Sequence, residues 1–119
     1  MKITMLVAAL LLAASTSFGQ MMQKGEFQAN VNSEGWSLNG GSGMRTHLVF
    51  VKFGKAFTKD PMVSVSMTSF DAAPGKDGNV RMAIKPEQVT REGFTVKIST
   101  WGDSRVAGME GTWVAFTNK

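Results

Sequence analysis

The chain has 119 residues, a net charge of +4 and no cysteine, which excludes disulfide bonds and zinc sites built on thiolates. Its basic residues are scattered instead of clustered, which argues against nucleic acid as a partner. A single domain of about 100 residues has only a modest core, so we expect this chain to gain further burial by oligomerisation.

The first 19 residues have the composition of a secretory signal. Lys2 precedes an apolar run from Met5 to Ala14, and small and polar residues follow up to Gly19. A membrane anchor is the alternative, but the apolar run is about ten residues long and a bilayer span needs roughly 20. We therefore expect residues 1–19 to be cleaved, leaving a secreted, extracellular domain over residues 20–119 with no membrane span.

Three segments in the first half alternate as β-strands do. Residues 26–31 direct Phe27, Ala29 and Val31 inward, and residues 62–68 direct Val63, Val65 and Met67 inward. Residues 46–57 are apolar on both faces, with His47, Val49, Val51 and Phe53 on one and Leu48 and Phe50 on the other. Apolar residues on both faces indicate a neighbour beyond the domain's own core.

The second half continues the alternation. Val80, Met82 and Ile84 alternate with polar or small residues until Pro86, which should close that strand. Residues 93–118 (GFTVKISTWGDSRVAGMEGTWVAFTN) read as a β-hairpin with Trp101 at its mouth and Trp113 in the core. No segment supports a long amphipathic helix, so we predict an all-β fold, a six-stranded antiparallel β-sandwich.

Few residues suit catalysis. His47 is the single histidine and there is no tyrosine, so neither a catalytic triad nor a histidine-rich metal site has the necessary side chains. The apolar strand around His47 favours a core or interface role. Asp71, Asp77 and Asp103 lie in predicted loops, where they could act as acid and base on a glycosidic bond, although such aspartates ordinarily form turns. We predict that the protein is not an enzyme and needs no metal or cofactor.

A carbohydrate site needs a flat aromatic face and rigid charged groups for hydroxyls. Trp101, Arg81 and the loop aspartates offer this chemistry, although Arg81 can equally be a solvated strand residue and Trp101 a cap on the core. The glycine-rich residues 39–43 (NGGSG) are either a slack connection or a loop whose amides approach a ligand closely.

Seven short motifs follow one another in a characteristic order. They are PMVSVS (61–66), FD (70–71), NVR (79–81), VT (89–90), GFT (93–95), TWGDSRV (100–106) and TWVA (112–115). This series resembles the H-type lectin domain of snail agglutinins and of the discoidin C-terminus, with the resemblance covering residues 53–116 well.

The resemblance implies a six-stranded β-sandwich that assembles as a homotrimer. It also implies binding of galactose- or N-acetylgalactosamine-type sugars on glycans or glycoproteins, without metal, in clefts between subunits. Arg81 and Trp101, with Gly102 beside it, match positions of the family's sugar cleft. Gly40 and Ser42 match the loop of the adjacent subunit that completes the cleft.

The chain departs from the family pattern at three places. Residues 39–43 contain no aspartate, and Gly102 and Ala107 stand where some snail lectins have a histidine and a tyrosine. Each loss removes a polar or aromatic contact to a sugar. An alternative function is therefore a secreted structural or adhesion module that keeps the sandwich, has lost sugar binding and acts through protein contacts.

Overall fold

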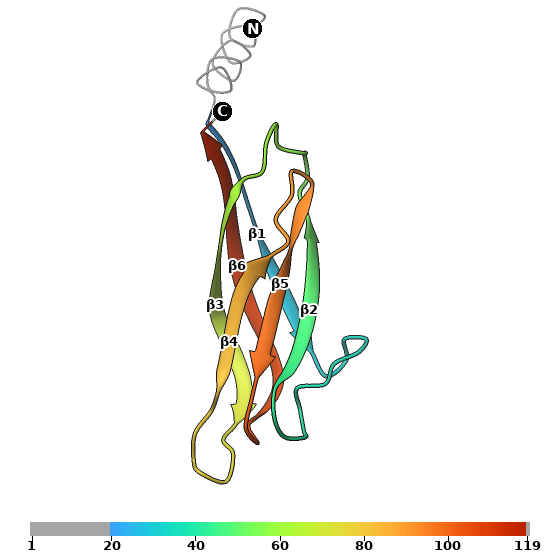
Figure 1. Ribbon diagram of the computed structural model, residues 1–119, viewed down its shortest axis with the longest axis vertical. Helices are drawn as coiled ribbons and strands as arrows, with labels where there is room; N and C mark the ends of the chain where they lie inside the picture. The colour runs from blue at the N-terminus through green and yellow to red at the C-terminus, as the bar shows by residue number, and fades with distance from the viewer. Residues whose placement is uncertain (1–19, 119) are drawn as a thin grey trace, which may run out of the picture.

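The structure, a computed structural model, describes residues 20–118, so the predicted signal over residues 1–19 lies outside the described residues. Six strands follow in order: β1 (Gln20–Asn30), β2 (Arg45–Lys52), β3 (Met62–Ala73), β4 (Met82–Glu87), β5 (Gly93–Thr100) and β6 (Arg105–Asn118). They form two three-stranded sheets, ordered β1-β6-β3 and β2-β5-β4, that pack against each other (Figure 1). All the strand pairs are antiparallel, which confirms the predicted sandwich.

The core lies between the two sheets and is rich in aromatic side chains. Phe94, Val96 and Ile98 of β5 are fully buried, as their alternation predicts. The Trp113 ring of β6 lies 5.6 Å from the rings of both Phe53 and Phe94, measured between centroids. The predicted core role of Trp113 is therefore confirmed.

The predicted hairpin over residues 93–118 is wrong. β5 pairs with β2 and β4, whereas β6 pairs with β1 and β3, so residues 101–104 carry the chain from one sheet to the other. Alternation shows which side chains face the core, but a hairpin and a crossing between packed sheets produce the same alternation. Trp101 thus lies where the chain changes sheets.

β1 is longer than predicted, and its far end differs. It begins at Gln20 because β6 offers a partner along its whole length, from Asn118 opposite Gln20 to Gly108 opposite Asn30. Val31 was predicted to point inward, but it follows the last strand residue and is exposed. The predicted inward orientation of Phe27 and Ala29 is confirmed.

β2 and β4 also end at other residues than predicted. β2 stops at Lys52, although Phe53 just beyond it is buried as expected. Pro86 does not close β4, since it pairs with Val96 inside the strand. β4 is an edge strand, where a proline whose nitrogen faces away from the neighbouring strand is tolerated. Val80 precedes β4 and is exposed, contrary to the predicted alternation.

Gly111 in the central strand β6 leaves room for groups of both neighbouring strands in its own sheet, Phe27 of β1 and Ser66 of β3. A Cβ there would lie 2.4 Å from both the Phe27 ring and the backbone oxygen of Ser66. We therefore expect Gly111→Ala to lower the free energy of unfolding by roughly 1–3 kcal/mol, measured by chemical denaturation. Gly54→Ala is the matched control, because its Cβ would make only an ordinary 3.8 Å contact with Gln23. Equal stability of the two variants would contradict the close packing at Gly111.

Candidate functional site

Three loops meet at the end of the sandwich drawn at the bottom of Figure 1, and they contain all the predicted sugar-binding residues. They are residues 31–44, 74–81 and 101–104. The N–H of Gly43 donates to the Gly102 oxygen over 3.0 Å, and the N–H of Lys76 donates to Asp103 Oδ2 over 3.0 Å. Residues 101–104 therefore connect the other two loops, because they hydrogen-bond to both of them.

Arg81 is fixed through its backbone, just before β4 begins. Its N–H donates to the Ser104 hydroxyl over 3.0 Å, and its carbonyl oxygen accepts from the Thr100 hydroxyl over 2.6 Å. Ser104 and Thr100 are both fully buried. The start of the Arg81 side chain is consequently held by two rigid core groups.

The Arg81 guanidinium group forms an ion pair with Asp77, with 2.6 Å between Nη2 and Oδ2. Hydrogen bonding to Arg81, with help from the N–H of Asn79, holds the pKa of Asp77 well below its ordinary value. The carboxylate in turn raises the pKa of Arg81. Both side chains keep exposed surface, 30% for Arg81 and 48% for Asp77, so the pair is open to a ligand.

Gly102 lies beside this ion pair, and Trp101 precedes it in the loop that changes sheets. A Cβ on Gly102 would approach Arg81 Nη1 to 3.5 Å, so the guanidinium group passes over the glycine. Gly102 has a φ of +66°, which glycine adopts without strain. Trp101 remains 36% exposed, so it does not act as a buried cap on the core.

The glycine loop of residues 39–43 is held in place and is not a slack connection. Arg45 donates to the oxygens of Gly40, Gly43 and Gly102, the last over 2.8 Å. One guanidinium group therefore joins the loop to the backbone beside Trp101. Ser42 is exposed at the loop surface.

The remaining polar candidates do not form a catalytic cluster. Asp71 lies within β3 and not in the predicted loop, while Asp77 and Asp103 each bond a different partner. His47 is buried, with its ring 4.9 Å from the ring of Trp36, which supports a core role. Within residues 20–118, no three histidine, cysteine, aspartate or glutamate side chains gather as a metal site would require.

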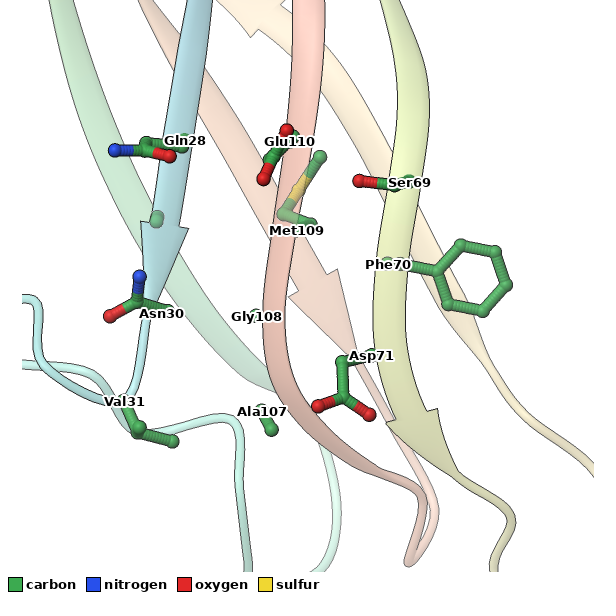
Figure 2. A pocket seen from close by; sticks show the side chains of 11 residues that line it. Gln28, Asn30, Val31, Ser69, Phe70, Asp71, Ala107, Gly108, Met109 and Glu110 are labelled. Atoms are coloured by element: carbon green, nitrogen blue, oxygen red, sulfur yellow. The ribbon is translucent and has the colours of Figure 1, made fainter.

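A separate hollow of about 370 Å³ lies on the outer face of the β1-β6-β3 sheet (Figure 2). Gly108 of β6 forms its floor, and polar side chains surround it. They are Gln28, Asn30, Ser69, Asp71 and Glu110. Phe70 also lines this hollow, although its ring points to the side of β3 away from β6 in Figure 2. The alternation of the sequence does not predict this hollow, because the hollow is formed only when β1, β6 and β3 pair in one sheet.

Comparison with protein families identifies the family of this domain. The family profile described as the H-type lectin domain matches residues 48–116. The chain belongs to the H-type lectin family. This H-type lectin is a binding protein and not an enzyme, and the predicted family is confirmed.

Two curated proteins and a solved structure show the range of similarity. Discoidin-2 of Dictyostelium discoideum is 37% identical over 79 residues, which are 66% of this chain and 30% of discoidin-2. A Fuscovulum blasticum protein named ATP synthase subunits region ORF 7 is 34% identical over 83 residues, 70% of each chain. The structure of wild-type discoidin II superposes with a TM-score of 0.75 and 32% identity. That superposition covers 84% of this lectin but only 37% of the discoidin chain.

Two contributors to the loop cluster were not identified from the sequence. Arg45 ties the glycine loop to Gly102, and Ser104 fixes Arg81. Both act on residues at least 20 positions away, since the separations are 57 and 23 residues. Ser104 falls inside the TWGDSRV motif, so its place in that motif was the available signal.

Glycans are the class of ligand that lectins bind. No helix among the described residues is long and apolar enough to cross a membrane.

Proposed function

We propose that this lectin binds galactose- or N-acetylgalactosamine-type glycans through Arg81, Trp101 and Gly102. The observation that carries the proposal is the guanidinium group of Arg81, held by the core, passing over Gly102 next to an exposed tryptophan. A charged donor supplies hydrogen bonds to sugar hydroxyls, and an indole ring supports the C–H face of a sugar. Gly40 and Ser42 of an adjacent subunit complete the cleft in this proposal.

The cleft requires a homo-oligomer, which we propose to be a homotrimer. Leu48 and Phe50 are exposed on the outer face of the β2-β5-β4 sheet, with 58% and 67% of their surface accessible. Met22, Phe116 and Met62 lie side by side in register on the outer face of the other sheet. Two different apolar surfaces on one subunit support a head-to-tail contact, the kind that closes into a ring.

A glycan array with residues 20–119 tests the proposal, with light scattering at the same concentrations. We expect binding to galactose-type glycans that free galactose or N-acetylgalactosamine inhibits, together with a trimeric mass. No signal on any glycan would contradict sugar binding, and a monomeric mass would contradict the intersubunit cleft. Sequencing the N-terminus of the exported protein tests secretion, since a chain that still begins at Met1 would contradict the signal peptide.

The second candidate is an adhesion module that no longer binds sugar. The absence of a carboxylate from residues 39–43 is the observation in its favour. Competition by free monosaccharide separates the two functions, because protein contacts should be insensitive to it.

Glycan binding should persist in mild acid. The lowered pKa of Asp77 keeps its carboxylate ionised well below the ordinary aspartate pKa of about 3.9, and Arg81 stays charged throughout. Asp103 is the other charged group that acts on Arg81, and it favours the charged form. The stability contributed by the ion pair is present above pH 4 or so and is lost only as the pH falls through the lowered pKa of Asp77.

Affinity measured by titration calorimetry between about pH 7 and 4.5 should therefore stay constant. Near-ultraviolet circular dichroism at each pH controls for the integrity of the fold. A loss of affinity in this range with an intact fold would contradict the assignment of the ion pair to the site.

A further inference from the structure

The acidic group missing from the glycine loop has a counterpart elsewhere in the same chain. Residues 39–43 contain no carboxylate, whereas Asp77 of the neighbouring loop pairs directly with Arg81. Asp103, the other aspartate in the loop cluster, is engaged by the N–H of Lys76. Asp77 is therefore the carboxylate positioned against the proposed sugar-binding arginine.

The orientation of Asp77 is set by its own turn. Its Oδ1 atom accepts the N–H of Asn79 over 3.0 Å, while its Oδ2 atom contacts Arg81. Gly78, which lies between Asp77 and Asn79 in the sequence, has a φ of +79°, a backbone conformation that glycine adopts readily in tight turns. A carboxylate offers about four lone-pair sites, so Asp77 keeps capacity for a further hydrogen bond besides those from Asn79 and Arg81.

One buried hydroxyl group fixes the segment that carries the pair. Ser104 Oγ donates to the Asn79 oxygen over 3.1 Å and accepts the N–H of Arg81. This hydroxyl is completely buried, so it cannot relax toward solvent. The acceptor of Asp77 and the donors of Arg81 are thus arranged before any ligand arrives, which lowers the entropic cost of binding.

We propose that Asp77 supplies the carboxylate of the sugar site from the same chain, and that Asp77 and Arg81 together clamp two adjacent sugar hydroxyls. One hydroxyl donates to the free lone pair of the carboxylate, and its neighbour accepts from the guanidinium group. The adjacent free hydroxyls that galactose and N-acetylgalactosamine share are those on C3 and C4. The clamp rests on the proposed function, since it assigns ligands within that site.

The test compares Asp77→Asn with Asp60→Asn by titration calorimetry with galactose. Asp60 lies in the connection between β2 and β3, away from the loop cluster, so it controls for loss of one negative charge. We expect Asp77→Asn to weaken affinity by about tenfold to a hundredfold, as loss of a charged acceptor does, and Asp60→Asn to leave it unchanged. Asp77→Ser, whose hydroxyl can still accept the N–H of Asn79, should weaken affinity equally.

Deoxy sugars distinguish direct contact from mere positioning of Arg81. Removing the C3 or the C4 hydroxyl should weaken binding to the wild type strongly. Asp77→Asn should lose little further affinity when the removed hydroxyl is the one that donates a hydrogen bond to Asp77. Equal penalties in both proteins would overturn the clamp. So would unchanged or tighter binding by Asp77→Asn, and tighter binding would show that Asp77 competes with the sugar for Arg81. In either case the wild type still binds galactose, whereas failure of the proposed function would appear as no binding by the wild type.

Discussion

Arg81→Ala is expected to abolish detectable glycan binding while leaving the fold intact. The substitution removes the charged donors of the proposed site and leaves the Asp77 carboxylate without its partner. A hydrogen bond to a charged group contributes about 1.5–3 kcal/mol, or roughly tenfold to 150-fold in affinity. Arg81→Ala removes more than one such donor and also leaves Asp77 without its partner, so its loss should exceed this range and take the weak binding of a single site below detection.

The fold should survive this change because the core holds the backbone of Arg81 and not its side chain. The bonds from Thr100 and to Ser104 involve main-chain atoms that alanine retains. The ion pair with Asp77 is exposed to solvent, and exposed pairs contribute little to stability. Unfolding by denaturant should therefore show a change within about 1 kcal/mol of wild type.

Arg91→Ala is the matched control for binding. Arg91 lies in the turn between β4 and β5, at the opposite end of the sandwich from the loop cluster (Figure 1). Both variants lose one positive charge, so a general electrostatic attraction to acidic glycans would affect them alike. Wild-type affinity in Arg81→Ala, or equal losses in the two variants, would show that the sugar binds elsewhere.

The inward faces of the strands could be predicted from the sequence because alternation reports burial directly. Val63 and Val65 of β3 pack against the core, and Phe94 of β5 is inside it, as their spacing indicates. The number of strands and the sandwich follow from the same signal together with the turn dipeptides. Trp113 was also placed correctly, since an aromatic residue in mid-strand faces the core in this pattern.

The pairing of strands could not be obtained in this way. β5 and β6 are consecutive and both alternate, yet they lie in different sheets. Only the partners on either side decide this, and those partners come from distant parts of the chain. Pro86 within β4 is a similar case, because a proline is tolerated at a sheet edge and the sequence does not show which strand is the edge.

The candidate site shows the same division between local and long-range information. Arg81, Trp101 and the loop aspartates were recognised by side-chain type and motif. The pairing of Arg81 with Asp77 was not, because it requires a turn at Gly78 and a buried hydroxyl 23 residues away. Side-chain chemistry identifies the groups, and the tertiary fold decides which of them act together.

Phe94→Ala should be the most destabilising of the substitutions considered for this lectin. Phe94 is fully buried, and its ring lies 5.7 Å from that of Phe53 and 5.6 Å from that of Trp113. Truncation leaves a cavity between the two sheets that these rings cannot fill, and such changes cost about 3–5 kcal/mol. A domain of this size has only about 5–15 kcal/mol of stability, so a large share should be lost in denaturant unfolding.

Phe50→Ala provides the matched control and a test of the outer surface in one variant. Phe50 lies opposite Thr95, the residue next to Phe94, but on the outer face of the same sheet. At concentrations where the chain is monomeric, Phe50→Ala should change the free energy of unfolding by less than about 1 kcal/mol. If both phenylalanine variants lost equal stability in the monomer, the difference in burial between the two side chains would be contradicted.

The same variant tests the outer surface in the oligomer. If the stability lost by Phe50→Ala grew with protein concentration, another copy of the chain would cover this face, since only association depends on concentration.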